Sequence, residues 1–176
     1  MNNSSATLMV AAFDHAVCIK ISGRANFTSS LDLKKLVNEL GERGYTRFVF
    51  DLSECMTMDS TFLGVLSGIG LKFFDAKTNA TTHPLDLLNP NPRIAETLEN
   101  LGVLHLFNIC TEPEPLARNF QPLAHDDSAS RADVTRTCLE AHQTLMGINP
   151  DNVRKFKDVA QFLAEDLKRL EMAEKK

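Results

Sequence analysis

The segment from residue 47 to residue 66 does most to limit what this chain can fold into. Residues 47–52, Arg-Phe-Val-Phe-Asp-Leu, are nearly all apolar, which indicates a short strand buried on both faces. A short loop follows, and Asp59-Ser60-Thr61 then lead into an apolar run with helical length. A strand covered on both sides and followed by a helix predicts an α/β sandwich.

Apolar periodicity predicts further strands and helices on both sides of this segment. The expected strands are residues 8–13, 16–22, 47–52, 83–88 and 103–109, and the expected helices begin at Thr28 or Ser29, near Ser60, and at Asn91-Pro92. The order is β-β-α-β-α-β-α-β. It predicts a mixed four- to five-stranded sheet with packed helices over residues 1–110, with parallel central strands and an antiparallel opening hairpin.

The composition changes at Thr111. Residues 111–129 are rich in Pro and acidic residues, and we interpret them as a linker. Residues 130–176 contain two amphipathic helices joined at Met146-Gly147-Ile148 and end in a charged tail, which predicts an α-hairpin. Its apolar stripe is compatible with three roles: covering a face of the first domain, forming a homodimer, or recruiting a second protein.

Charge and cysteine content exclude several classes of protein. The net charge is −4 and the pI about 5.7, so no basic surface for nucleic acid or anionic membrane is expected. The four cysteines are widely separated, which favours a reduced protein. We see no signal peptide, and no apolar run is long enough to span a bilayer. We therefore expect a soluble, cytoplasmic protein.

The Asp59-Ser60-Thr61 sequence is the most informative candidate site. A phosphate on Ser60 would lie at a helix start, where backbone N–H groups and the helix dipole favour negative charge. The simpler alternative is that Asp59 caps the helix and the two hydroxyl residues fill its first turn. Residues 62–74 are apolar nearly all round, which fits either burial under the C-terminal hairpin or a partner-binding face. Gly64 and Gly68 share one face of this helix, which favours close packing.

Catalytic and metal sites are not expected. No G-x-S-x-G sequence is present, and Ser60 could act as a nucleophile only if a histidine distant in sequence came near it. Cys138 and His142 lie one helical turn apart and could supply two metal ligands, but no second pair accompanies them. We therefore predict no catalytic residue, no metal and no cofactor.

Two sequence elements resemble a known family. Asp51-Leu-Ser ends the buried strand, and Met58-Asp-Ser-Thr-Phe-Leu-Gly-Val-Leu66 opens the next helix. Together with the element order, they resemble the STAS domain, most closely the bacterial anti-sigma factor antagonists, whose pattern here is D-L-S, a loop, then D-S-S-G-L-G-V-L. Residues 23–28 resemble a second, weaker family element. The resemblance covers about residues 6–110.

The resemblance implies a non-enzymatic regulator that switches between partners. Unphosphorylated, such a protein binds an anti-sigma factor or a related serine kinase; phosphorylation breaks the complex, and a PP2C-type phosphatase restores it. The implied phosphoacceptor is Ser60, with Thr61 as the alternative, and we expect Ser60 to be exposed. The implied partner-binding residues are Asn26, Thr28, Asp59, Thr61, Phe62 and Leu63.

Three residues depart from the family pattern. Phe62 replaces the usual glycine, and Arg24 and Asn26 stand where acidic residues are frequent. These departures bear on kinase access and on charge matching to a partner. The alternative reading is a constitutive interaction or small-ligand-binding module of the same fold in which Ser60 is never phosphorylated.

Overall fold

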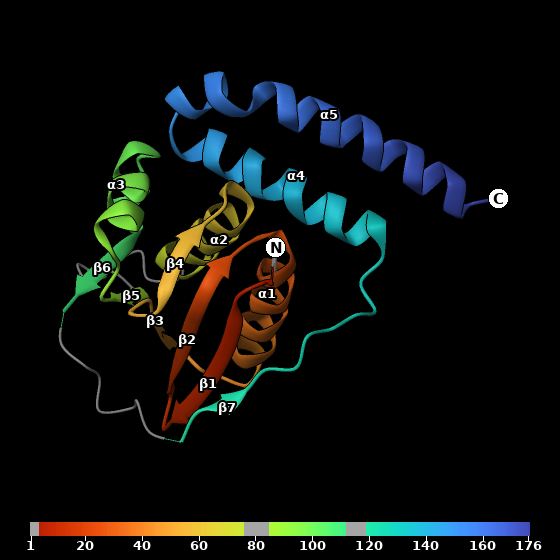
Figure 1. Cartoon of the computed structure of the whole chain (residues 1–176). Coiled ribbons are helices and arrows are strands. Elements are labelled where there is room, and N and C mark those ends of the chain that lie inside the picture. The colour runs from red at the N-terminus through yellow and green to blue at the C-terminus, as the bar shows by residue number, and fades with distance from the viewer. Residues whose placement is uncertain (1–3, 76–84, 112–118) are drawn as a thin grey trace.

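The computed structural model describes residues 4–75, 85–111 and 119–176 (Figure 1). The strands are β1 Thr7–Phe13, β2 Ala16–Ala25, β3 Arg47–Asp51, β4 Cys55–Met58, β5 Leu85–Leu88, β6 Phe107–Cys110 and β7 Gln121–Pro122. The helices are α1 Phe27–Glu42, α2 Ser60–Asp75, α3 Pro92–Asn100, α4 Arg131–Ile148 and α5 Asp151–Glu174, with a 3₁₀ turn at Leu104–Leu106. None of the described helices is long and apolar enough to cross a membrane.

The sheet is mixed, as predicted. Its order is β6-β5-β3-β2-β1-β7; β2, β3, β5 and β6 run parallel, and β1 is antiparallel to both β2 and β7. The short strand β4 pairs with the end of β2. The predicted count of four to five strands is wrong, because β4 and β7 were not expected. They have four and two residues, which is too short for a periodic pattern to stand out.

Several predicted element boundaries also differ. The last strand was expected from residue 103, but a 3₁₀ turn takes residues 104–106 and the strand begins at Phe107. Residues 83–84 of the fourth expected strand lie outside the described residues. Helix α1 begins at Phe27, because Asn26 rather than Thr28 or Ser29 caps it: its side chain accepts hydrogen bonds from the backbone N–H groups of both residues.

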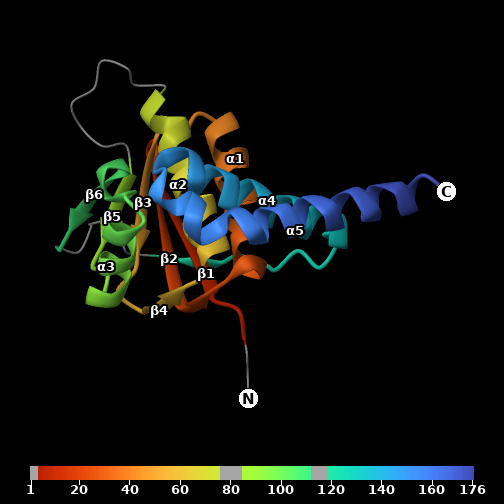
Figure 2. The same ribbon diagram turned by 90° about the horizontal axis from the view of Figure 1, so that it is seen from above.

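Strand β3 is buried on both faces, which confirms the interpretation of its apolar sequence. Phe48 and Phe50 belong to the main core with β2 and β5, while Val49 packs on the opposite side with Cys18 and Leu88. Helices α1 and α2 lie on one side of the sheet, and the α4–α5 hairpin lies across α2 (Figures 1 and 2). The C-terminal end of α5 projects beyond these layers (Figure 2).

The predicted linker is attached to the domain along part of its length. We call residues 119–130 the strap. Within it, β7 pairs with β1, and the amide of Leu123 donates to the carbonyl of Leu8 at 2.9 Å. His125 Nδ1 lies 2.6 Å from an Asp32 carboxylate oxygen, and Lys35 Nζ lies 2.7 Å from Asp126. The strap therefore leads the chain from the β1 edge along α1 to the start of α4.

The strap should loosen as pH rises. The hydrogen bond to Asp32 raises the pKa of His125 above its ordinary value of 6.5. Because the folded-state pKa is the higher one, the stabilisation is complete below about pH 6.5 and is lost as pH rises through the folded pKa. We expect the Asp126 amide, which donates to Asp32 at 3.2 Å, to lose protection, corrected for intrinsic exchange, as pH rises above about 6.5. His125→Gln should remove this dependence, and an identical pH profile in both chains would contradict the assignment.

Candidate phosphoacceptor site

Asp59 fixes the start of α2. Its amide donates to the carbonyl of Ala25 at 2.9 Å, which ties the end of β4 to the end of β2. One carboxylate oxygen accepts from the amide of Phe62, and the other from the amide of Phe27, both at 2.8 Å. Asp59 thus caps α2, which confirms the prediction that it is a helix cap. Its carboxylate also joins the first turns of α1 and α2.

Ser60, the first residue of α2, is bound by the C-terminal hairpin. Its Oγ lies 2.9 Å from Nε2 of His142 on α4. Nδ1 of the same ring lies 2.7 Å from the carbonyl oxygen of Cys138. A carbonyl only accepts, so Nδ1 carries a proton; in a neutral ring Nε2 is then the acceptor and the Ser60 hydroxyl donates. His142 is buried, and its ring packs edge-on against Phe156 of α5 at 5.1 Å between centroids.

The expectation that Ser60 is exposed is therefore wrong. Its side chain is half-buried, because α4 passes over the start of α2 and places His142 on the hydroxyl. The motif alone could not indicate this, since the covering helix begins 71 positions later, at Arg131.

Thr61 is covered by the same helix. It is 6% exposed, and its hydroxyl lies beside the thiol of Cys138. Burial raises the pKa of that thiol above its ordinary value. Helix α4 therefore binds both hydroxyl groups of the motif, through two side chains one turn apart.

Two of the predicted partner-binding residues lie in the core. Phe62 is 0% exposed and Leu63 is 2% exposed, and both belong to the main hydrophobic cluster. Because both side chains are buried, they offer almost no contact surface to a partner, and the expectation for them is corrected. Asn26, Thr28 and Asp59 are half-buried around the two helix starts and keep exposed surface.

Helices α2 and α4 approach very closely at Gly64. A Cβ atom built on Gly64 would lie only 2.4 Å from the carbonyl oxygen of Ala141. On Gly68, one turn further along, it would lie 3.8 Å from Thr144, which is ordinary contact. The close-packing interpretation is therefore confirmed at Gly64. Of the two roles considered for this apolar helix, burial under the C-terminal hairpin is the one observed.

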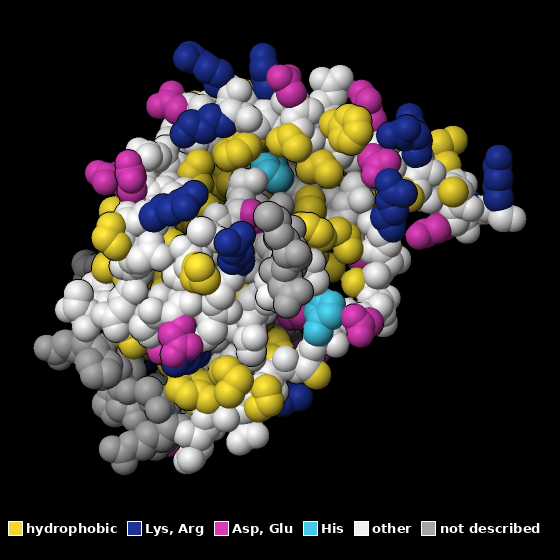
Figure 3. Space-filling view, viewed as in Figure 1, with side chains coloured by type: hydrophobic (Ala, Val, Ile, Leu, Met, Phe, Trp, Pro, Cys, Tyr) yellow, Lys and Arg dark blue, Asp and Glu magenta, His cyan; other side chains and the backbone are white. Residues whose placement is uncertain are grey.

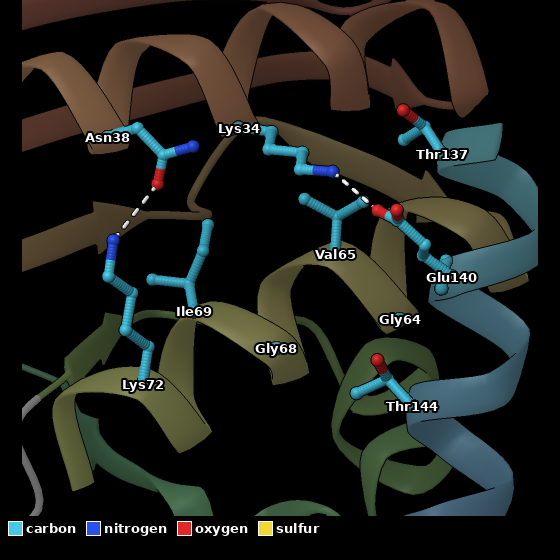
Figure 4. Close-up of a pocket in the computed structure, with 11 residues that line it drawn as sticks. Lys34, Asn38, Gly64, Val65, Gly68, Ile69, Lys72, Thr137, Glu140 and Thr144 are labelled. Carbon is cyan, nitrogen blue, oxygen red and sulfur yellow. Dashed lines mark hydrogen bonds and ion pairs between the residues drawn. The ribbon is translucent and has the colours of Figure 1, made fainter. Parts of the chain in front are cut away.

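A groove of about 210 Å³ lies where α1, α2 and α4 meet (Figure 4). Val65, Gly68 and Ile69 of α2 line it. Lys34 of α1 reaches across it to Glu140 of α4, with 2.7 Å between Nζ and Oε2 (Figure 4). The groove is mostly apolar with charged groups at its rim, and Ser60 does not line it.

Ser60 could act as a nucleophile only with a histidine beside it, and His142, which is distant in sequence, does contact its hydroxyl. The backbone carbonyl of Cys138 orients the ring, as the third member of a catalytic triad would. Neither described cavity, however, is lined by Ser60. Across residues 4–75, 85–111 and 119–176, no group of three His, Cys, Asp or Glu side chains is placed to bind a metal ion.

The family follows from comparison with known proteins. The STAS domain family model matches residues 7–114, so the chain belongs to the STAS domain family. The solved anti-sigma factor antagonist SpoIIAA, in its unphosphorylated form, is 18% identical with a TM-score of 0.50, covering 60% of this chain and 89% of that one. A putative anti-sigma factor antagonist from Thermotoga maritima is 22% identical with a TM-score of 0.50, covering 58% and 85%.

At these identities the two solved structures establish the fold alone. None of the curated proteins compared with the chain matches it. The family match ends at residue 114, so the whole C-terminal hairpin lies outside it.

Sequence reasoning missed the role of His142. It noted that Cys138 and His142 share one helix face, but related them only to metal binding. The signal that could have connected them to Ser60 was the apolar stripe of the same helix, because its Ala141 lies on the α2-facing side between these two polar groups. A polar pair within an apolar stripe needs polar partners on the opposing surface.

Proposed function

We propose that this protein is an anti-sigma factor antagonist-like partner-switching regulator, controlled by reversible phosphorylation of Ser60. The observation that carries the proposal is the position of Ser60: in a STAS-family chain, it opens α2 directly after the capping Asp59. A phosphate at a helix N-terminus is favoured by the unpaired backbone N–H groups and the helix dipole.

Ser60 is a better acceptor than Thr61. Ser60 is half-buried, whereas Thr61 is 6% exposed and faces α4 and the thiol of Cys138. A kinase needs the hydroxyl in an accessible position, and only Ser60 has part of its side chain at the surface. Thr61 remains the alternative acceptor if the hairpin moves away.

The proposed partners follow from the same site. The unphosphorylated protein binds an anti-sigma factor or a serine-kinase-type protein through the exposed parts of Asn26, Thr28 and Asp59 around Ser60. Phosphorylation adds about −1.5 to −2 charge beside the Asp59 carboxylate, which repels the bound partner. A PP2C-type phosphatase resets the switch. The proposal involves no cofactor, no membrane and no direct contact with nucleic acid.

Affinity capture of the full chain from its own cells tests this proposal. Ser60→Ala should retain the captured partner, and Ser60→Asp should lose it by about tenfold or more. Ser60→Asn is the matched control, because it has the size of aspartate without its charge, and it should bind like Ser60→Ala. Equal recovery of the partner by the alanine, asparagine and aspartate chains would contradict the switch.

The alternative function is a constitutive interaction or small-ligand module. The groove between α1, α2 and α4 supports it, because its mostly apolar lining suits a small, largely apolar molecule. Native mass spectrometry of the chain purified from its own cells would show a bound molecule, and Ser60 would carry no phosphate.

The Ser60–His142 pair also favours a test for hydrolase activity. Labelling of Ser60 by an active-serine probe would support a hydrolase, and inertness toward the probe would exclude it.

A further inference from the structure

The C-terminal hairpin occupies the surface on which the proposed switch depends. The Ser60 hydroxyl is hydrogen-bonded to Nε2 of His142 at 2.9 Å, and Cys138 lies beside the Thr61 hydroxyl. Gly64 lies one turn further along α2, and there the backbone of Ala141 on α4 packs so closely that a Cβ atom on Gly64 would clash with it. These three contacts place α4 directly over the first two turns of α2. A protein that binds around Ser60 therefore contacts α4, because α4 covers the start of α2.

The hairpin is also fastened away from Ser60. Asn152, at the start of α5, donates from Nδ2 to the carbonyls of Leu101 and Leu145, at 2.8 and 2.9 Å. Lys155 of α5 donates from Nζ to the carbonyl of Asn100 at 3.1 Å. Along α4 and α5, Figure 3 shows a row of hydrophobic side chains that continues onto the body of the domain. Displacing α4 from Ser60 therefore leaves other attachments that can return it.

We propose that the α4–α5 hairpin is a built-in occupant of the Ser60 surface, and that a phosphate on Ser60 displaces α4 from α2. This inference rests on the proposed function and names the regulation of the same site. Phosphorylation of Ser60 then acts twice: it repels the partner held through Asn26, Thr28 and Asp59, and it separates α4 from α2.

The geometry gives three reasons for displacement. The phosphoester carries no proton on Oγ, so the hydrogen bond donated to Nε2 of His142 is lost. The phosphoryl group must enter a space that now separates Oγ and Nε2 by only 2.9 Å. Its charge also lies beside the carboxylate of Asp59, which is already engaged in capping and cannot donate.

Helix α4 has little room to adjust locally. At Gly64 the two backbones are already so close that a single added carbon would clash. Interfaces packed this closely do not deform continuously, so the alternative to the docked position is a separated one. A His142 imidazolium that bound the phosphate instead would give the opposite result, a hairpin held more firmly.

Hydrogen exchange of the full chain tests this inference without the partner. Phosphoserine incorporated at position 60 during synthesis is compared with the unmodified chain, and Ser60→Asn serves as the uncharged control. We expect exchange of the amides in residues 138–148 to accelerate about tenfold or more in the phosphoserine chain, with β3 unchanged. The asparagine chain should show a clearly smaller acceleration.

Two glycine variants calibrate the measurement. Gly64→Ala should release α4 through its clash with Ala141 and accelerate the same amides, whereas Gly68→Ala, which has room for its methyl group, should not. Both changes add a residue with higher helix propensity, so β3 protection shows that the domain remains folded. Unchanged or slower exchange of residues 138–148 in the phosphoserine chain would overturn the inference. So would a Gly64→Ala chain in which exchange of these residues is not accelerated.

The result is separable from the fate of the proposed function. If Ser60 is never phosphorylated in cells but the installed phosphoserine releases α4, the proposed function fails while the coupling between Ser60 and the hairpin stands. If Ser60 is phosphorylated in cells but the hairpin stays docked, the proposed function stands and the displacement is wrong.

Discussion

Phe62→Ala is expected to lower the free energy of unfolding by about 3–5 kcal/mol. Phe62 is 0% exposed and packs in the main core beneath α2, so removing its ring leaves a cavity that the surrounding strands cannot fill. The family pattern has glycine at this position, and the structure shows why the larger residue is accommodated here: the ring points inward. Chemical denaturation of the full chain, followed by circular dichroism, measures the loss.

Phe162→Ala is the matched control for this change. Phe162 lies on α5 and is 64% exposed, so the same substitution should change stability by no more than about 0.5 kcal/mol. If the two substitutions had similar small effects, Phe62 would not be a core residue, and its assignment as a partner contact would have to be restored.

Asn152→Asp is expected to destabilise the docked hairpin by at least about 3 kcal/mol at neutral pH. Asn152 is 0% exposed, and its Nδ2 group donates to two backbone carbonyls. An aspartate there can only accept when ionised, so it places a buried negative charge against the carbonyl oxygens of Leu101 and Leu145. Hydrogen exchange across α5 measures the release of the hairpin.

The effect of Asn152→Asp should depend on pH in a defined direction. Burial raises the pKa of a carboxyl group, so the folded-state pKa of the new aspartate lies above its unfolded value of about 3.9. Docking is therefore least impaired at acid pH and weakens as pH rises through the folded pKa. Asn149→Asp is the comparison: its side chain is half-buried, its carboxylate can still accept from the amide of Asp151, and it gives up only a long 3.5 Å donation from Nδ2 to the carbonyl of Leu101, so a smaller effect is expected.

The fold could be predicted in its main features because the β-β-α-β-α-β-α-β core repeats strong local signals. The apolar run of β3, the Asn91-Pro92 start of α3 and the capping Asp59 are each encoded within a few residues, and all are confirmed. Strands β4 and β7 were missed because each is stabilised by pairing with a neighbour rather than by its own pattern. The start of α1 was misplaced because Asn26 takes the capping position ahead of Thr28 and Ser29.

The site was only partly predictable, for a physical reason. The role of Asp59 is local, since its carboxylate reaches the amide three residues ahead. The environment of Ser60 depends on a helix that arrives from residue 131 onward, and periodicity predicts that helix without saying what it covers. Phe62 was carried over as a contact by its place in the motif, whereas its direction is set by the turn of the helix, which points it into the core.

The position of the hairpin changes how the departures from the family pattern are interpreted. Phe62 bears on core packing rather than on kinase access, because its ring does not reach the surface. Access to Ser60 is limited by His142 instead. Asn26 stands where acidic residues are frequent, yet it serves α1 as its capping residue and also accepts a hydrogen bond from Ser5 at 2.9 Å.

Quantitative phosphopeptide mapping of residues 55–72, in the full chain captured from its own cells, tests the central claim most directly. We predict phosphate on Ser60, present in the pool that is free of partner and absent from the pool bound to it. A peptide that is unmodified in both pools under every growth condition, or that carries its phosphate at Thr61 alone, would contradict the assignment of Ser60 as the switch.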